Sequence, residues 1–134
     1  MPTNYKFTDF DIDFTRNNFT NDLSLKTDRN SIRQSIMNLI LTRPGEKPFN
    51  RNFGVGVHDL LFETPSSTDF QRLEMDIKHE IILREPRAEV KSVVFDSSKV
   101  DANELTITIN YIVRQGLQAK PILDSLQIEI TKVR

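Results

Sequence analysis

One continuous segment, from Thr68 to Phe95, combines a helix, a proline stop and a strand, and this order constrains the fold more than any other feature. The apolar side chains that recur at helical spacing, and so share one face, are Phe70, Leu73, Ile77 and Ile81. Thr68 and Gln71 have the spacing of a capping box at the start of this helix. Pro86 ends it, because the proline ring excludes the preceding residue from helical geometry. The sequence therefore predicts a helix that stops at Glu85-Pro86-Arg87.

A two-residue alternation predicts a strand after this corner. The two alternating sets are Ala88, Val90, Ser92 and Val94 on one side and Glu89, Lys91, Val93 and Phe95 on the other. The corner thus holds two opposite charges at a rigid joint between two packed elements, where we expect it to be exposed. It is the first candidate for function. The alternative is a helix stop whose internal Glu–Arg pair only braces the turn, and the two roles are compatible.

The remaining segments complete an α+β architecture. Leu23 and Leu25 favour a short strand, and a helix after Asp28 or Asn30 has its apolar positions at Ile32, Ile36, Leu39 and Ile40. Residues 57–61 suggest one or two further helical turns. Residues 105–113 and 126–130 alternate as half-buried strands do. We therefore predict one three-stranded antiparallel meander, with a short N-terminal strand, packed with two to three helices.

Three of the four glycines and two of the six prolines fall between residues 42 and 63, in the text TRPGEKPFNRNFGVGVHDLLFE. Such density predicts a compact loop shaped by its backbone, and we expect Phe49 and Phe53 to anchor it. The pair Gly54 and Gly56 is not a dinucleotide fingerprint, because the third glycine and a preceding strand are missing. Gly45-Glu46-Lys47 does not form a phosphate-binding loop either.

Composition excludes several classes of protein. A chain of 134 residues is one ordinary domain, and its 18 basic and 19 acidic residues leave a net charge of −1. This balance gives no footprint for nucleic acid or for a membrane surface. The absence of cysteine removes disulfides and thiolate chemistry together. No apolar run approaches ~20 residues and no signal-peptide core is present, so we expect a soluble protein made in the cytoplasm.

Residues 1–22 are predicted to form an extended N-terminal arm, and residues 23–134 the folded domain. The arm carries four of the nine phenylalanines, at Phe7, Phe10, Phe14 and Phe19, whose rings have to be buried on this domain or on a neighbour. Asp9, Asp11 and Asp13 resemble the opening of an EF-hand loop. Phe14 and Thr20 then stand where that loop needs glycine and a bidentate glutamate, so no calcium site is expected. His58 and His79 lie in separate helices without ligand-spaced partners, and no metal or cofactor is predicted.

Several motifs in this order resemble the gene-product-25-like baseplate wedge family of contractile phage tails, which includes a component of type VI secretion systems. They are residues 42–50 (TRPGEKPFN), Phe53-Gly54, Leu61-Phe62-Glu63, Glu85-Pro86-Arg87 and the Asp11-Ile12-Asp13-Phe14 run. The resemblance covers nearly the whole chain. One departure is Lys47 where the family often has arginine, which keeps the charge and loses the bidentate fork.

The resemblance implies a structural part of a contractile injection machine, made in the host cytoplasm and present in six copies around the tail tube of a virion or related particle. Glu85, Pro86 and Arg87 would engage a helical core bundle of larger wedge proteins, with Lys47, Pro48, Phe49, Phe53 and Gly54 in the neighbouring loop. The last strand, through the outward residues Gln127, Glu129 and Thr131, would offer an edge on which the tail sheath subunit starts to assemble. Contacts with tube or hub-proximal baseplate proteins are also implied.

The alternative function is a virion-associated, lysozyme-like enzyme that degrades peptidoglycan. Glycoside hydrolysis needs two carboxylates roughly 5–10 Å apart across a cleft, one of them with a raised pKa. With 19 acidic residues, a pair such as Glu63 and Glu85 is expected by chance. Sugar sites also stack rings on aromatic side chains, and this chain has no Trp and only two Tyr. We therefore predict that it is not an enzyme.

Overall fold

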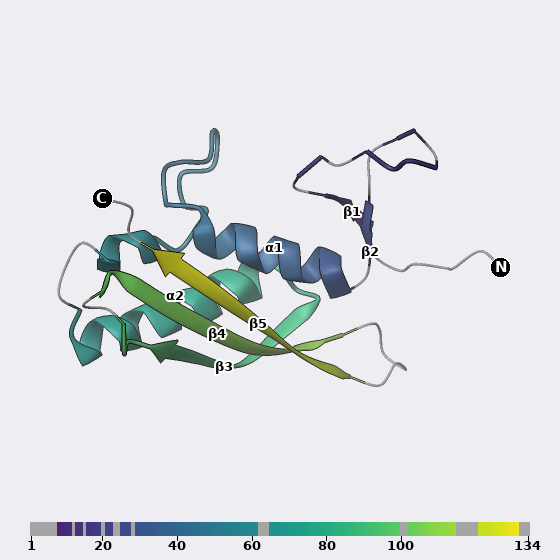
Figure 1. Ribbon diagram of the computed structural model, residues 1–134. Helices are drawn as coiled ribbons and strands as arrows, with labels where there is room; N and C mark the ends of the chain where they lie inside the picture. Colours follow the sequence, from purple (N-terminus) through teal and green to yellow (C-terminus); the bar gives the residue numbers. More distant parts are fainter. Residues whose placement is uncertain are drawn as a thin grey trace.

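The computed structural model describes residues 8–11, 13–14, 16–19, 21–22, 25–27, 29–61, 65–99, 102–114 and 121–131. Predictions that concern Phe7, Ile12, Leu23, Phe62 and Glu63 lie outside these residues. The predicted α+β class is confirmed. Three consecutive strands, β3 (Ala88–Asp96), β4 (Glu104–Val113) and β5 (Ile122–Thr131), form an antiparallel meander in that order, with β4 in the centre (Figure 1).

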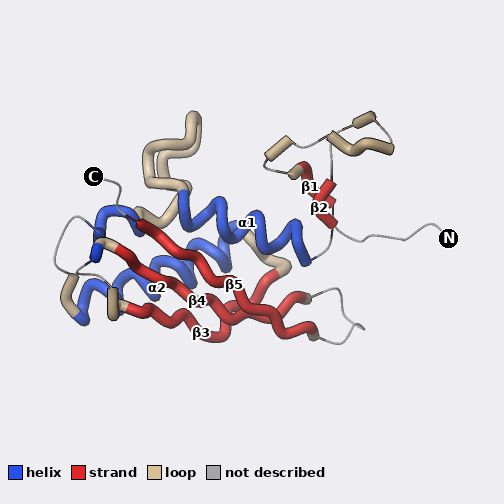
Figure 2. The backbone as a smooth tube through the Cα atoms, viewed as in Figure 1, coloured by secondary structure: helices blue, strands red, loops and turns tan. Residues whose placement is uncertain are grey.

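Two α-helices and one short 3-10 helix pack with this sheet. Helix α1 (Arg29–Leu41) contacts β5, and helix α2 (Ser67–Arg84) lies along β3. The 3-10 helix η1 (Val57–Leu61) follows the glycine-rich loop, which projects beyond the end of α1 (Figure 2). No helix in the described part of the chain has the length and apolarity needed to cross a lipid bilayer.

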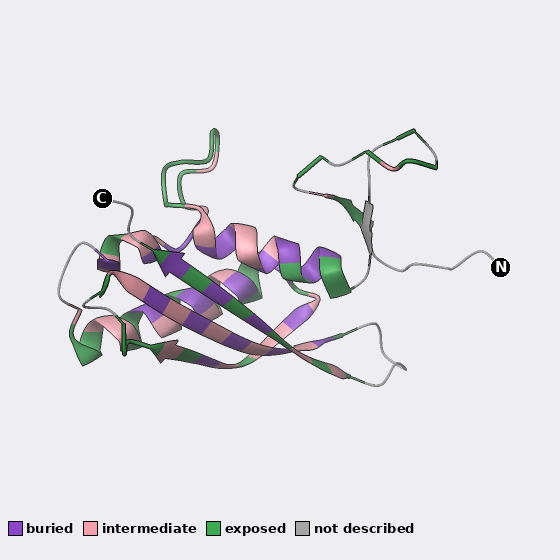
Figure 3. Ribbon diagram, viewed as in Figure 1, coloured by how far each residue is buried: buried purple, intermediate pink, exposed green. Residues whose placement is uncertain are grey.

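The core forms where the inward faces of these elements meet. Figure 3 shows the buried positions alternating along β4 and β5. The completely buried residues include Ile36 of α1, Ile77 of α2 and Tyr111 of β4. Each predicted helix therefore has its apolar stripe on the sheet side, which is the arrangement that the helical spacing predicted.

The start of α2 differs from the prediction. The helix is capped by Ser66 and Asp69, not by Thr68 and Gln71: the backbone N–H of Ser66 donates to Asp69 Oδ2 at 2.8 Å, and the N–H of Asp69 donates back to Ser66 Oγ. An aspartate in the first turn also interacts favourably with the positive end of the helix dipole. The hydrogen bonds from Ser66 lower the pKa of the Asp69 carboxyl. The helix ends at Arg84 with Glu85 as its C-cap, as expected from Pro86.

The single alternation predicted for β3 is wrong after Val90. A β-bulge shifts the register between Val90 and Ser92, so Lys91 is the extra residue in the strand. Before the bulge Ala88 faces the core; after it Val93 is buried while Val94 is exposed. The bulge therefore explains why apolar residues fall in both alternating sets.

The N-terminal segment forms a second, two-stranded sheet beside α1. Strand β1 (Thr8–Phe10) pairs antiparallel with β2 (Leu25–Thr27). The side chain of Gln34 on α1 donates to the carbonyl oxygen of Phe10 at 2.6 Å and so attaches this sheet to the helix. The rings of Phe10, Phe14 and Phe19 are exposed, so these three are not buried on their own domain.

Candidate functional site

The Glu85-Pro86-Arg87 corner is built around an internal ion pair. The guanidinium of Arg87 holds both carboxylate oxygens of Glu85: Nη2 donates to Oε2 at 2.6 Å, and Nε donates to Oε1. Glu85 is only 2 % exposed, whereas Pro86 is exposed and Arg87 is partly exposed. The expectation that both charges of the corner are exposed is therefore wrong for Glu85, because its carboxylate points inward and closes the turn.

The electrostatics of the pair favour the charged form of both groups. Burial opposes ionisation of Glu85, but hydrogen bonds from Arg87 and from the Ser35 hydroxyl of α1 bring the pKa of this carboxyl below its ordinary value. The hydrogen bond to Glu85 raises the pKa of Arg87 against the effect of burial, and the charge of Asp9 adds to this rise. The corner thus joins α2, β3, α1 and the N-terminal sheet at one point.

An apolar stripe on the outer face of α2 leads to this corner, and sequence reasoning missed it. Met75, Ile82 and Leu83 are 66 %, 64 % and 59 % exposed, although they belong to a helix that packs its other face into the core. Met75 and Ile82 are seven residues apart, about two helical turns, and so share one side of the helix, with Lys78 and His79 between them. Ile82 and Leu83 lie one turn before Pro86. The sequence signal that could have revealed these residues is a second apolar spacing along α2, offset from the core positions.

The neighbouring loop is held by its backbone and by one aromatic ring. Gly54 has φ +105°, and an added Cβ would lie 2.2 Å from the carbonyl oxygen of Thr42, so only glycine fits. The ring of Phe53 lies under the Lys47 ammonium, 4.0 Å from the centroid, and 5.5 Å from the guanidinium carbon of Arg84. These cation–π contacts attach the loop to the end of α2. Phe53 therefore anchors the loop as predicted.

Phe49 does not anchor the loop, and this part of the prediction is wrong. Its side chain is fully exposed at the loop tip, next to the exposed Pro48, and its backbone has φ +64°. A phenylalanine in the left-handed region carries a conformational cost, because its Cβ approaches the following carbonyl oxygen. A turn needed only to reverse the chain would be served by glycine or asparagine there. Packing within the described part of the chain therefore does not explain the position of Phe49.

A hollow of about 700 Å³ lies beside the loop, and Ser35 in its wall connects it to the corner. It is lined by α1, by the N-terminal sheet and by the loop, through Asp9, Ser35, Asn38, Glu46, Lys47 and Phe53 among others. Ser35 also bonds Glu85, and the charge of Asp9 acts on Arg87. The structure therefore brings Glu85, Arg87, Lys47 and Phe53 into one surface region, which we call the corner surface. The loop meets the end of α2 through Arg84, which donates to the Asn52 carbonyl oxygen at 3.4 Å, and we include the loop tip and the exposed stripe of α2 in the corner surface.

The three predicted residues of the last strand lie elsewhere. Gln127, Glu129 and Thr131 are exposed and alternate with the buried Leu126, Ile128 and Ile130. Strand β5 is one edge of the sheet, and β3, which begins at the corner, is the other. The predicted site residues therefore belong to two separate surfaces.

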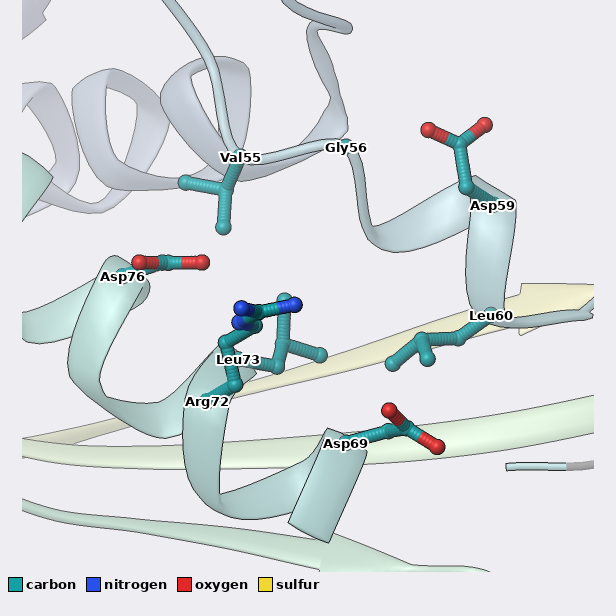
Figure 4. Close-up of a pocket in the computed structure, with 8 residues that line it drawn as sticks. All are labelled: Val55, Gly56, Asp59, Leu60, Asp69, Arg72, Leu73 and Asp76. Atoms are coloured by element: carbon teal, nitrogen blue, oxygen red, sulfur yellow. The ribbon is translucent and has the colours of Figure 1, made fainter. Parts of the chain in front are cut away.

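A second pocket, of about 320 Å³, lies between α2 and the segment that includes η1 (Figure 4). Asp69, Arg72 and Asp76 come from α2, while Asp59 comes from η1. The Asp69 carboxyl is already held by Ser66, and its pKa is lowered and not raised. Within the described residues, no group of three or more histidine, aspartate or glutamate side chains could hold a metal ion.

Comparison with known proteins agrees with this architecture. Residues 26–117 match the family model of "Baseplate wedge protein gp25". A 72-residue segment is 32 % identical to the baseplate wedge protein gp25 of Enterobacteria phage T4, and the match spans 54 % of each protein, about half the length of that relative.

Two solved structures share the fold. A putative tail lysozyme from Geobacter sulfurreducens is 28 % identical with a TM-score of 0.69, and the match covers 83 % of this chain and 96 % of that one. A chain of the anti-feeding prophage baseplate is 21 % identical with a TM-score of 0.60, over 92 % and 83 % of the two chains. The family model spans most of this chain, and the chain therefore belongs to the gp25 family of tail baseplate wedge proteins.

Proposed function

We propose that the chain is a structural wedge component of a contractile tail baseplate or a related contractile injection system. The corner surface binds a bundle of helices from larger wedge proteins, and the β5 edge starts sheath assembly. The observation that carries the first part is the Glu85–Arg87 pair, which holds the exposed Pro86 rigidly at the end of an exposed apolar helix stripe.

The chemistry of the corner surface fits a helical partner. Ile82 and Leu83 present an exposed apolar patch at the end of α2, with Met75 two turns earlier, and apolar ridges of a second helix pack against such a patch. Phe49 adds a rigid aromatic ring, the kind of residue that contributes most at protein interfaces. Arg87 is 27 % exposed at its side chain, and an arginine side chain at such a position can donate to carbonyl groups at a helix C-terminus.

Co-purification tests this part. The tagged chain is expressed with the wedge proteins encoded beside it, and Pro86→Ala and Ile82→Ser are compared with Val94→Thr, which changes an exposed apolar side chain on β3 away from the corner. The first two variants should weaken association by about 1–2 kcal/mol, or about 5- to 30-fold. Val94→Thr should have no effect. Equal recovery of the wedge proteins with all three variants would contradict the proposal.

The second part of the proposal concerns the sheath. Among the described strands none pairs with the outer edge of β5, whose backbone N–H and C=O groups a strand of another chain can therefore complete. A proline at Gln127 or Glu129 removes a donor from that edge and leaves the core side chains in place. Baseplates with either variant should assemble on a tube and remain without a sheath in electron micrographs. Normal sheaths on baseplates that contain the folded variant would contradict this part.

A second candidate function, peptidoglycan hydrolysis, is favoured by the name of the Geobacter protein. Glu85 is an unsuitable general acid, because Arg87 holds both its oxygens and its pKa is lowered. We expect purified chain, free of other virion proteins, not to clear peptidoglycan above a buffer blank at about pH 5 or about pH 7. Reproducible clearing that is lost on changing one carboxylate would establish this second function.

A further inference from the structure

The outer edge of β5 is not uniform along its length. At Ser125 both backbone groups are already bonded to side chains: the N–H donates to Asp124 Oδ1 at 3.0 Å, and the carbonyl oxygen accepts from Arg33 Nη2 of α1 at 2.6 Å. The N–H is therefore occupied, and the carbonyl oxygen already accepts from a charged donor. The edge is closed at Ser125 by residues of this chain.

These two bonds also establish which backbone groups of β5 point away from β4, towards the open edge of the sheet. In an antiparallel ladder the N–H and C=O of one residue point to the same side, and successive residues alternate. Ser125 points away from β4, so Gln127, Glu129 and Thr131 do so as well. The pairing of β4 with β3 agrees with this. The N–H of Arg114, just after β4, donates to the carbonyl oxygen of Arg87, so the even-numbered residues at that end of β4 point their backbone groups towards β3 and the odd-numbered ones towards β5.

The closure at Ser125 is a polar cluster between α1 and the sheet. Arg29 Nη2 lies 3.1 Å from Asp124 Oδ1, and the Tyr111 hydroxyl donates to Asp124 Oδ2 at 3.1 Å. Asp124 is 9 % exposed at its side chain, and Tyr111 is completely buried. Burial would raise the pKa of Asp124, but hydrogen bonds from Arg29, from the Ser125 N–H and from Tyr111 hold it below its ordinary value. The cluster is thus a charged, well-bonded part of the fold.

The opposite edge of the sheet is poorly suited to strand addition. Strand β3 is interrupted by the bulge at Lys91, which twists a strand and breaks its regular spacing of donors and acceptors. Lys91 and Arg114 both pair with Glu89 near this bulge. The N–H of Ala88 is also bonded to the carbonyl of Glu85 at 3.0 Å. By comparison, β5 pairs with β4 in one unbroken register from Ile122 to Thr131.

We propose that an extended segment of about five residues from a sheath subunit pairs with Gln127–Thr131 of β5 and ends at Ser125, where the Arg29/Arg33–Asp124 cluster stops it. This inference rests on the proposed function of the β5 edge and specifies its length and register. The cluster acts as a stop that prevents pairing farther towards Ile122. It therefore sets the limit of the first added strand at Ser125.

Amide hydrogen exchange with single-residue resolution tests the inference. In the isolated chain, the amides of Gln127, Glu129 and Thr131 should exchange at least about tenfold faster than those of Leu126, Ile128 and Ile130, which are bonded to β4. In baseplates carrying a sheath, the outward three should slow at least about tenfold, and Leu123 and Ser125 should not change. Protection that extends through Leu123 would overturn the stop. Protection of no outward β5 amide would overturn the proposed function of the edge and the inference with it.

Proline variants give a second, matched readout. Ser125→Pro, Gln127→Pro and Glu129→Pro each place a proline at an outward, exposed position of the same strand. Baseplates with Ser125→Pro should be sheathed as often as the unmodified ones, while those with the other two should be bare. Circular dichroism and incorporation into baseplates confirm that each variant is folded. Bare baseplates with folded, incorporated Ser125→Pro would show that pairing needs Ser125 and would contradict the stop.

Discussion

Arg87 encloses the carboxylate of Glu85 from two residues further along the chain, with Nη2 2.6 Å from Oε2 and Nε bonded to Oε1. Because Glu85 is 2 % exposed, the pair belongs to the interior of the turn as much as to its surface. The same motif thus braces the joint between α2 and β3 and presents Pro86 outward. The bracing role and the proposed binding role are therefore compatible.

Arg87→Ala should destabilise the isolated domain, because Glu85 would remain buried without its charged partner. Loss of such a bond costs about 1–3 kcal/mol, and the partial exposure of Arg87 keeps the expected loss within that range. Denaturant unfolding followed by circular dichroism measures it. Arg87→Lys keeps the charge and loses the two-pronged hydrogen bonding, so its unfolding free energy should lie between those of the unmodified chain and Arg87→Ala. An unchanged midpoint in Arg87→Ala would show that the pair does not brace the turn.

Stability should decrease in acid through the same residue. The pKa of Glu85 in the folded chain is below its ordinary value of 4.5, so the unfolded chain binds the proton first as the pH falls. The contribution of Glu85 is complete above about pH 5 and is lost as the pH falls below 4.5 through the folded-state pKa. Hydrogen bonds from Lys91 and Arg114 lower the pKa of Glu89 to about 2, so protonation of Glu89 in acid also decreases the stability of the fold.

Glu85→Gln separates the effect of this residue from that of the other acids. The difference in unfolding free energy between the unmodified chain and Glu85→Gln should be about 1–3 kcal/mol near pH 7. It should shrink steadily from about pH 5 towards pH 3. A difference that stays constant over this range would mean that the charge of Glu85 does not contribute to stability.

Gly54→Ala should disrupt the loop far more than Gly45→Ala. Both glycines have positive φ, but an added Cβ meets the Thr42 carbonyl oxygen at 2.2 Å in the first case and nothing within 4 Å in the second. Gly45→Ala should cost about 1–2 kcal/mol from backbone strain alone. Gly54→Ala should cost about 3 kcal/mol or more, because the backbone itself has to move. Equal unfolding midpoints for the two variants would contradict the close packing at Gly54.

Phe49→Asn should stabilise the isolated chain and weaken its association with the wedge proteins. Asparagine tolerates the left-handed backbone better than phenylalanine does, so the gain is up to about 1 kcal/mol. Val94→Thr is again the control, because Val94 is exposed on β3 and is outside the positive-φ region. It should change neither quantity. Association that is unaffected by Phe49→Asn would remove the loop tip from the proposed interface.

Periodicity in the sequence predicts the elements of this fold, because a residue spacing reports directly which face is buried. The stripe of α2 and the alternation in β4 and β5 are of this kind. The bulge at Lys91 could not be predicted, since a bulge is a property of the pairing with β4 and lysine is common in strands. The helix cap was misassigned by two residues because Ser66 and Thr68 both head capping-box spacings.

The sequence predicted which residues belong to the candidate site, but not which of them are buried, exposed or bonded to one another. Motif resemblance identified Glu85-Pro86-Arg87, but a hydrogen bond that helps to keep the buried Glu85 charged comes from Ser35 of α1, fifty residues earlier. Phe49 was expected to pack inside the loop because aromatic rings usually do. The structure shows its side chain exposed, on a backbone with φ +64° that the sequence does not indicate. The division of the β5 edge depends on Arg33, which has no local signal as a strand stop.

An electron cryomicroscopy reconstruction of an assembled tail that contains this chain tests the account most directly. It should show Pro86 and the exposed stripe of α2 against a helical bundle, and a strand of a sheath subunit hydrogen-bonded to Gln127, Glu129 and Thr131 and ending at Ser125. A reconstruction in which both the corner surface and the β5 edge face solvent, with the chain held through other surfaces, would contradict it.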